Sequence, residues 1–154
     1  LYISTSWANS LQQKAAQDVQ QQYLTGLWHC QSASPQLRYN GFIQYHKNQS
    51  YTENSTLQIK FNGQWISVPY QAHAKWSFTN GNPQNIILSN YQQSAFSLEH
   101  LQLDEQEQSA LHHELSQIGA KRSQVVRLAQ NILVLNYRDH WSHHTSLRCS
   151  KKKA

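Results

Sequence analysis

The chain has 154 residues, only 14% of them charged, and a formal net charge of +5. This length fits one domain that can bury a hydrophobic core without a structural metal. Residues 1–120 carry five Lys and Arg against seven Asp and Glu, whereas residues 121–154 carry eight against one. Arg is not interleaved with aromatic residues as in a nucleic-acid groove, so nucleic acid is not an expected partner. The lysines near the C-terminus are interpreted as a solvated basic tail, residues 151–154.

The first residues suggest that the chain is a processed product. It begins at Leu1, contains no methionine and opens with the segment LYISTSW. We therefore expect that a signal peptide or a membrane anchor preceded it. From Asn9 to Leu24 apolar residues repeat every four positions and Gly26 follows, which predicts a helix. Residues 1–23 are assigned to this helical segment.

From residue 27 to about residue 101 the pattern changes to the alternation of apolar and polar residues that is typical of β-strands. The chain also holds three Asn-Gly pairs, at residues 40–41, 62–63 and 80–81. Each pair predicts a hairpin turn, because type I′ turns need positive φ at both central residues. Pro69 is expected to interrupt or bend the strand that contains it.

Residues 104–118 break this alternation and predict a helix inserted before the final strands. Acidic residues crowd its start, where the helix dipole favours them, and Gly119 follows its end. Two apolar runs at 125–128 and 132–135 then predict a pair of strands. A last strand is expected through residues 139–149.

The two cysteines, Cys30 and Cys149, lie far apart in the sequence and lack the spacing of a zinc site. An even number of cysteines after an export signal favours a disulfide that joins the first strand to the last. Two buried free thiols are the alternative. A disulfide indicates an oxidising compartment, so we expect a periplasmic or secreted protein, with anchoring in the inner membrane left open.

The C-terminal segment DHWSHHTSLRC brings three histidines close to a cysteine. On a strand, His140 and His144 would lie about 13 Å apart at roughly 3.3 Å per residue, too far to share one metal ion. His143 points to the opposite face and could meet only a histidine of a neighbouring strand. We therefore expect no metal and no other cofactor, and keep metal binding through these three histidines as an alternative.

Catalytic motifs are missing from the sequence. It contains no GxSxG elbow, no GxGxxG loop and no Walker loop. Acidic residues cluster at 104–107, where helix capping explains them. The chain is therefore expected not to be an enzyme.

Several short segments, taken in order, resemble small exported bacterial domains of the lipocalin-like, calycin type. They are LTGLWHC, YHKNQSY, TLQI, AKWSFTNGN, NILVLNY and SLRC. Gly26 and Trp28 match the G-x-W that opens the first strand of such domains. Residues 48–50 replace an Asp-Gly-Thr turn, and Ala74 replaces a second glycine. The resemblance implies an antiparallel meander closed or half closed into a barrel, with Trp28 packed at one end.

The expected fold is α+β. An antiparallel meander of eight or nine strands curls into a full or half barrel, with an N-terminal helix and one inserted helix near 104–118. Residues 24–150 make up the lipocalin-like β domain.

The expected function is that of a non-enzymatic binding module of a bacterial envelope, alone or as the soluble part of a membrane-anchored protein. It would recognise a small apolar ligand or an envelope protein. The aromatic candidates for a ligand site are Tyr70, Trp76, Phe78 and Trp141, with plain core packing as their other role. A second hypothesis is an immunity protein or inhibitor that blocks a periplasmic toxin or a cell-wall hydrolase.

Overall fold

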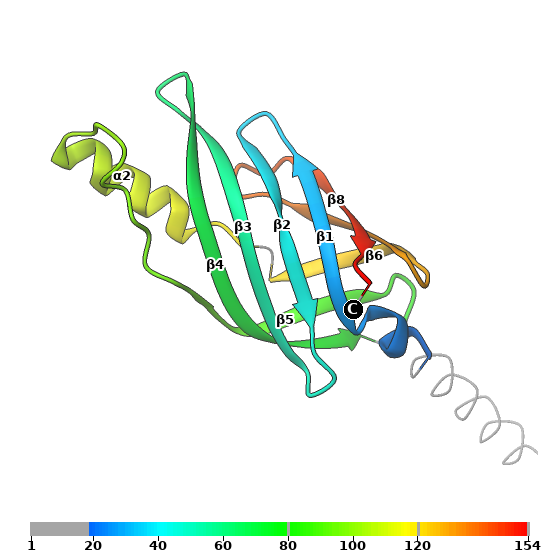
Figure 1. Ribbon diagram of the computed structural model, residues 1–154. Coiled ribbons are helices and arrows are strands. Elements are labelled where there is room, and N and C mark those ends of the chain that lie inside the picture. Colours follow the sequence, from blue (N-terminus) through cyan, green and yellow to red (C-terminus); the bar gives the residue numbers. More distant parts are fainter. Residues whose placement is uncertain (1–18, 80, 120, 154) are drawn as a thin grey trace, which may run out of the picture.

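Eight strands form a closed antiparallel barrel in the computed structural model, which describes residues 19–79, 81–119 and 121–153. Each strand pairs with the next in sequence, and β8 pairs with β1 (Figure 1). The strands are β1 (Gly26–Ala33), β2 (Leu37–Tyr45), β3 (Ser50–Phe61), β4 (Gln64–Thr79), β5 (Asn85–Gln93), β6 (Arg122–Leu128), β7 (Ile132–Arg138) and β8 (His144–Lys151). The predicted meander is confirmed, as a full barrel of eight strands.

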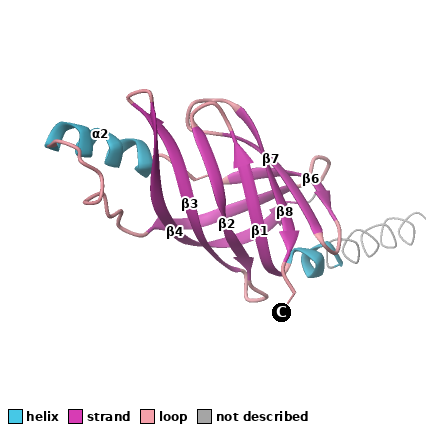
Figure 2. Ribbon diagram, turned by 45° about the horizontal axis from the view of Figure 1, so that its top comes forward, coloured by secondary structure: helices cyan, strands magenta, loops and turns pink. Residues whose placement is uncertain are grey.

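The two ends of the barrel differ. The connections at 34–36, 62–63 and 139–143 and the inserted helix lie at one end, which we call the mouth. The other end, the base, carries the helical residues 19–24 beside the end of β8 (Figure 2). Residues 9–18 of the predicted N-terminal helix, with its proposed start, fall outside the described residues.

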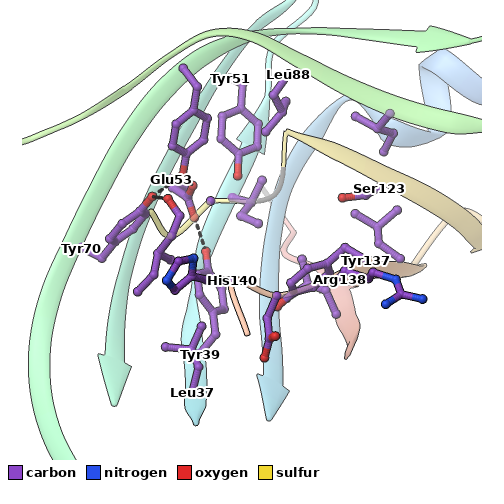
Figure 3. Close-up of a pocket in the computed structure, with 18 of the residues that line it drawn as sticks. Leu37, Tyr39, Tyr51, Glu53, Tyr70, Leu88, Ser123, Tyr137, Arg138 and His140 are labelled. Carbon is purple, nitrogen blue, oxygen red and sulfur yellow. Dashed lines mark hydrogen bonds between the residues drawn. The ribbon is translucent and has the colours of Figure 1, made fainter. Parts of the chain in front are cut away.

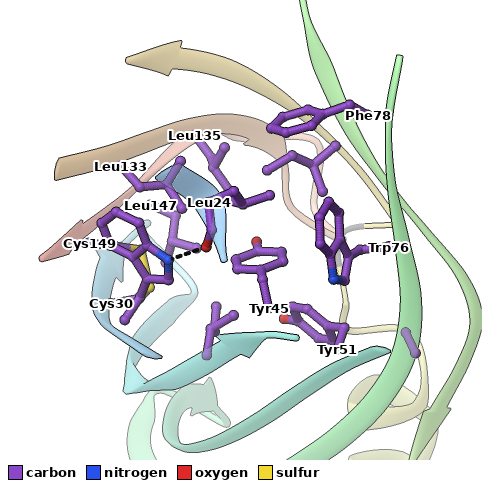
Figure 4. Packing of buried hydrophobic residues seen from close by; sticks show 14 residues of the cluster. Leu24, Cys30, Tyr45, Tyr51, Trp76, Phe78, Leu133, Leu135, Leu147 and Cys149 are labelled. Carbon is purple, nitrogen blue, oxygen red and sulfur yellow. Dashed lines mark hydrogen bonds between the residues drawn. A yellow bond between two sulfur atoms is a disulfide. The ribbon is translucent and has the colours of Figure 1, made fainter. Parts of the chain in front are cut away.

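A core of apolar side chains fills the base. Leu24 and Trp28 are fully buried there, and the Trp28 indole nitrogen Nε1 donates a 2.8 Å hydrogen bond to the Leu24 carbonyl oxygen. This bond joins the helical segment to β1, so Trp28 packs at one end of the barrel as the resemblance implied. Further inward-facing residues of the strands complete this cluster (Figure 4).

One Asn-Gly pair forms the predicted turn. Asn62 and Gly63 join β3 to β4 with φ values of 50° and 78°, the positive angles that a type I′ turn requires. The pair at 80–81 falls in the β4–β5 connection, but residue 80 lies outside the described residues.

The hairpin predicted at 40–41 is wrong, because both residues lie inside β2. The β2–β3 turn falls at residues 46–49 instead. A Cβ atom on Gly41 would lie 2.2 Å from the Ser55 Cβ atom, so this position needs glycine to let β2 and β3 approach. The glycine therefore reflects close packing between strands and not a turn.

The strand β4 continues through Pro69, so the expected interruption does not occur. Pro69 pairs with Thr56 of β3, whereas β4 pairs with β5 only from Ala72 onward. Proline is tolerated here because this part of β4 lacks a second neighbouring strand.

The predicted inserted helix is confirmed as α2 (Glu105–Ser116), which lies beside the β3–β4 hairpin at the mouth (Figure 1). Asp104 caps its start: its carboxylate accepts a hydrogen bond from the Glu107 backbone N–H at 2.8 Å, and the Glu107 carboxylate accepts one from the Asp104 backbone N–H at 3.3 Å. Leu111 and Leu115 are fully buried. They pack in a second cluster with inward-facing residues of β2, β3 and β4. No helix in the described part of the chain is long and apolar enough to cross a membrane.

The last strand begins later than predicted. β8 starts at His144, and residues 139–143 form the β7–β8 connection. Its turn is held by Asp139, whose carboxylate accepts hydrogen bonds from the backbones of Trp141 and His143 at 3.0 and 2.8 Å. Aspartate favours such turns because its side chain replaces a backbone acceptor.

The predicted disulfide is present between Cys30 and Cys149, whose α-carbons are directly paired across β1 and β8 (Figure 4). It links the two strands that close the barrel. Neither cysteine is therefore a free thiol.

Candidate functional site

A cavity of about 270 Å³ opens inside the barrel on the side of the mouth. Its walls come from the inner faces of the strands, from residues 117–119 after α2 and from the β7–β8 connection. Aliphatic side chains such as Ile43, Leu88 and Leu135 form part of the lining. Six tyrosines form another part: Tyr39, Tyr45, Tyr51, Tyr70, Tyr91 and Tyr137.

The acid inside this cavity is Glu53, near the start of β3. Alternation along the strand turns its side chain inward, and the residue is only 8% exposed. One carboxylate oxygen, Oε2, accepts a hydrogen bond from the Tyr39 hydroxyl at 2.7 Å, and Oε1 accepts one from the Tyr91 hydroxyl at 2.6 Å. Glu53 lies among the labelled tyrosines in Figure 3.

A chain of hydrogen bonds continues from Tyr91 to the end of α2. The Tyr91 and Tyr70 hydroxyl oxygens are 2.5 Å apart, and the Gln93 amide donates to the Tyr70 oxygen at 3.1 Å. Since Tyr91 gives its only proton to Glu53, Tyr70 is the donor in the pair of tyrosines. The Gln93 amide also donates to the Ile118 carbonyl oxygen at 2.5 Å. Tyr70 therefore donates toward Glu53 through Tyr91, whereas Gln93 donates both to Tyr70 and, away from Glu53, to the Ile118 carbonyl oxygen.

Burial sets the protonation of this group of residues. It raises the pKa of the Glu53 carboxyl above its usual value, while the nearby hydroxyls of Tyr91, Tyr39 and Tyr51 lower it. Burial and the nearby Glu53 carboxylate raise the pKa values of the same three tyrosines. Their hydroxyls stay protonated at neutral pH and remain hydrogen-bond donors.

The charged groups at the mouth form a separate set. Arg138, Asp139 and His140 line the opening, and the His140 ring lies 3.3 Å from the Glu114 carboxylate on α2. It is the only contact at ion-pair distance among the described residues, so Glu53 has no cationic partner in that part of the chain.

The aromatic candidates named from the sequence separate into different surroundings. Tyr70 lines the cavity. Trp76 and Phe78 lie in the apolar cluster toward the base (Figure 4), where the Trp76 indole donates to the His46 carbonyl oxygen at 3.0 Å. Trp141 packs beside the second cluster, with its ring centre 5.2 Å from that of His140. None of the three tryptophan and phenylalanine side chains lines the cavity.

The histidine candidates do not come together. His140 lines the mouth, His143 lies in the β7–β8 connection, and His144 opens β8 with an exposed side chain. The described residues contain no group of three His, Cys, Asp or Glu side chains placed to hold a metal ion.

Sequence reasoning missed Glu53, although a signal was available. It is the only acidic residue between residues 19 and 98. The alternation that assigns Leu57 and Ile59 to the apolar face of their strand places Ser55, Glu53 and Tyr51 on that same face when it is extended backward. An acid on the inner face of a barrel strand is a candidate binding group.

Comparison with known proteins adds no family assignment. No protein-family model matches the chain, and the comparison with curated proteins found no significant match. The closed eight-stranded antiparallel barrel is consistent with a lipocalin-like fold.

Proposed function

We propose that this protein is a non-enzymatic binding module that holds a small ligand in the cavity of its barrel. The observation that carries this proposal is the cavity itself, in which aliphatic walls surround Glu53 and the tyrosine hydroxyls. Sites for small molecules combine mostly apolar walls with a few placed polar groups. The volume of about 270 Å³ favours a small ligand, because it lies just below the range of about 300–1,000 Å³ typical of drug-sized ligands.

The protonation of the cavity supports binding over catalysis. Tyrosines with raised pKa values are held as donors and do not act as bases at neutral pH. Glu53 is engaged by hydrogen bonds from two hydroxyls. These groups are suited to orient a ligand.

Two further features support an exported protein of lipocalin-like type in a bacterial envelope. The barrel is closed, with a helical segment and Trp28 at its base. The Cys30–Cys149 disulfide is typical of an oxidising compartment such as the periplasm. We propose a periplasmic or secreted location, either free or as the soluble part of a membrane-anchored protein.

The proposal can be tested with two small aromatic probes of the same shape, neutral neopentylbenzene and cationic benzyltrimethylammonium. Titration followed by amide chemical shifts is expected to show binding of at least one probe, with the largest shifts at cavity residues such as Leu88 and Leu135. The side chain of Ser123 is buried and lines the cavity. Replacing it by phenylalanine should fill the cavity and weaken binding at least tenfold.

The matched control is Ser89→Phe, which adds the same ring at an exposed position of β5. Its affinity should equal that of the native protein. If neither probe binds, or if Ser123→Phe binds as well as Ser89→Phe, the cavity is not the binding site.

A further inference from the structure

Glu53 is a buried acid for which the described residues supply no positive partner. It is 8% exposed, and the only ion pair in the described ranges joins His140 to Glu114. An ionised carboxylate is costly to bury without a counter-charge, because it loses the solvation that water provides. A ligand that carries a positive charge into the cavity would supply that counter-charge.

The hydroxyl groups around Glu53 donate hydrogen bonds to it, which favours the ionised form of its carboxyl group. Tyr39 and Tyr91 both donate to its carboxylate, at 2.7 and 2.6 Å. Tyr70 and Gln93 donate along the chain that ends there. A carboxylate offers about four acceptor sites, so these two direct donors leave capacity for further hydrogen bonds. That capacity is open to a positively charged group of a ligand.

The walls next to Glu53 are aromatic. Tyr39, Tyr51 and Tyr91 line the cavity together with Tyr45 and Tyr70. The face of an aromatic ring attracts a cation within about 6 Å, and groups of such rings recognise quaternary ammonium ions. A neutral ligand would use the rings without the carboxylate, and an anion would be repelled by it.

We propose that the ligand of this cavity is a small organic cation, whose ammonium group pairs with Glu53 between the tyrosine rings. This inference rests on the proposed function, because it specifies which class of ligand the cavity takes. The volume of about 270 Å³ suits an amine with a single ring or a short branched chain better than a long lipid.

The mouth carries charges of both signs, so an anion must be tested beside the cation. Arg138, Asp139 and His140 line the opening, and one oxygen of Asp139 is buried without a hydrogen-bond partner. Arg138 is exposed. An anionic ligand would use Arg138 and His140 at the mouth, whereas the proposed cation reaches Glu53 inside.

Three probes with the same phenyl ring and similarly shaped head groups separate these cases. They are benzyltrimethylammonium, neutral neopentylbenzene and anionic phenylmethanesulfonate. Dissociation constants from chemical-shift titrations of the native protein are expected to show the cation binding at least tenfold more tightly than the neutral probe. The sulfonate should bind more weakly than either.

A variant without the charge tests whether Glu53 causes the preference for the cationic probe. Glu53→Gln keeps the shape of the side chain and an acceptor oxygen but removes the charge. The cation should lose at least tenfold in affinity, while the neutral probe should change by less than twofold. Glu99→Gln is the control, because it removes the same charge from an exposed residue outside the cavity.

Equal affinities for the cation and the neutral probe, tighter binding of the sulfonate, or a cation preference that survives Glu53→Gln would overturn this inference and leave ligand binding in place. If none of the three probes binds, both the proposed ligand binding and the proposed preference for a cation are contradicted. If Glu53→Gln does not fold, the comparison of the three probes on the native protein decides, because it needs no variant.

Discussion

Among single residues, Glu53 places a buried carboxyl group in the lining of the cavity. It occupies an inward position of β3, whose other buried residues are Tyr51, Ser55, Leu57 and Ile59. Hydroxyl groups replace part of the water that it loses on folding. Burial still dominates and raises the pKa of its carboxyl. Glu53 therefore contributes to the dependence of stability on pH.

The sign of that dependence follows from linkage. The pKa of Glu53 is higher in the folded protein than in the unfolded chain, so the folded state binds more protons between the two values. The free energy of unfolding should therefore fall as the pH rises from the ordinary glutamate pKa of about 4.3 to the raised value. Urea unfolding of the native protein and Glu53→Gln between pH 4 and pH 8 measures this effect.

The difference in unfolding free energy between the native protein and Glu53→Gln reports on the Glu53 carboxyl group alone, because the other titrating residues are common to both proteins. The unfolding free energy of the native protein minus that of Glu53→Gln should decrease with rising pH and then level off. A difference that stays constant or increases with pH would show that the pKa of Glu53 is not raised on folding.

At the scale of elements, the contact between β2 and β3 depends on Gly41. Gly41 pairs with both Cys30 of β1 and Ser55 of β3 in the middle of the sheet. An added Cβ atom would meet the Ser55 Cβ at 2.2 Å and its Cα at 2.5 Å. Because backbone atoms are involved, rotation of a side chain cannot relieve the contact.

Gly41→Ala is therefore expected to destabilise the protein by about 1–3 kcal/mol, the usual range for overpacking. Denaturant unfolding followed by tryptophan fluorescence gives the free energy of unfolding. Gly63→Asn is the control, since an added Cβ there meets nothing within 4 Å and asparagine tolerates positive φ. A loss in Gly41→Ala no larger than in Gly63→Asn would contradict the role assigned to Gly41.

Elements governed by local signals were predictable. The capping acid and the spacing of leucines located α2, and Asn62-Gly63 located its hairpin. Asn40-Gly41 carries the same dipeptide, but its glycine is needed by Ser55 on another strand, which no local pattern reveals. The alternation also predicts strand at 139–143, but the Asp139 side chain forms a turn there by accepting two backbone hydrogen bonds.

The candidate site was less predictable than the fold. Tyr70 was named because it lies on an apolar face, a property that Trp76 and Phe78 share. Tyr70 lies closer to the mouth than Trp76 and Phe78 do. That difference depends on how far each strand extends along the barrel. The link between Tyr70, Tyr91 and Gln93 also joins β4 to β5 and to the end of α2. Such contacts arise only when the barrel closes.

At the scale of the whole molecule, closure is secured by β1 and β8. Their backbones pair, and the Cys30–Cys149 disulfide crosses the same pair with a sequence separation of 119 residues. A crosslink over so long a loop restricts the unfolded chain and stabilises the folded state by about 4–5 kcal/mol in the chain-entropy model.

Reduction should therefore lower the melting temperature by about 10 °C or more, since about 1 kcal/mol corresponds to roughly 2–4 °C in a domain of this size. Calorimetry with and without a phosphine reductant tests this, with mass spectrometry to verify that the bond is open. A double Cys30→Ala, Cys149→Ala variant should melt at the same temperature in both conditions. An unchanged melting temperature of the fully reduced native protein would contradict the expected contribution.

Both ends of the described chain lie at the base of the barrel, opposite the mouth. The described chain enters the barrel at its base through residues 19–24 and leaves it there, where the Lys151 amine donates to the Tyr23 carbonyl oxygen at 2.7 Å. The cavity opens toward the opposite end, where residues 117–119 after α2 and the β7–β8 connection line it. A fusion partner joined directly to residue 19 or to residue 153 would therefore lie on the side of the base. The mouth would then face away from that partner and stay open to the surrounding solution.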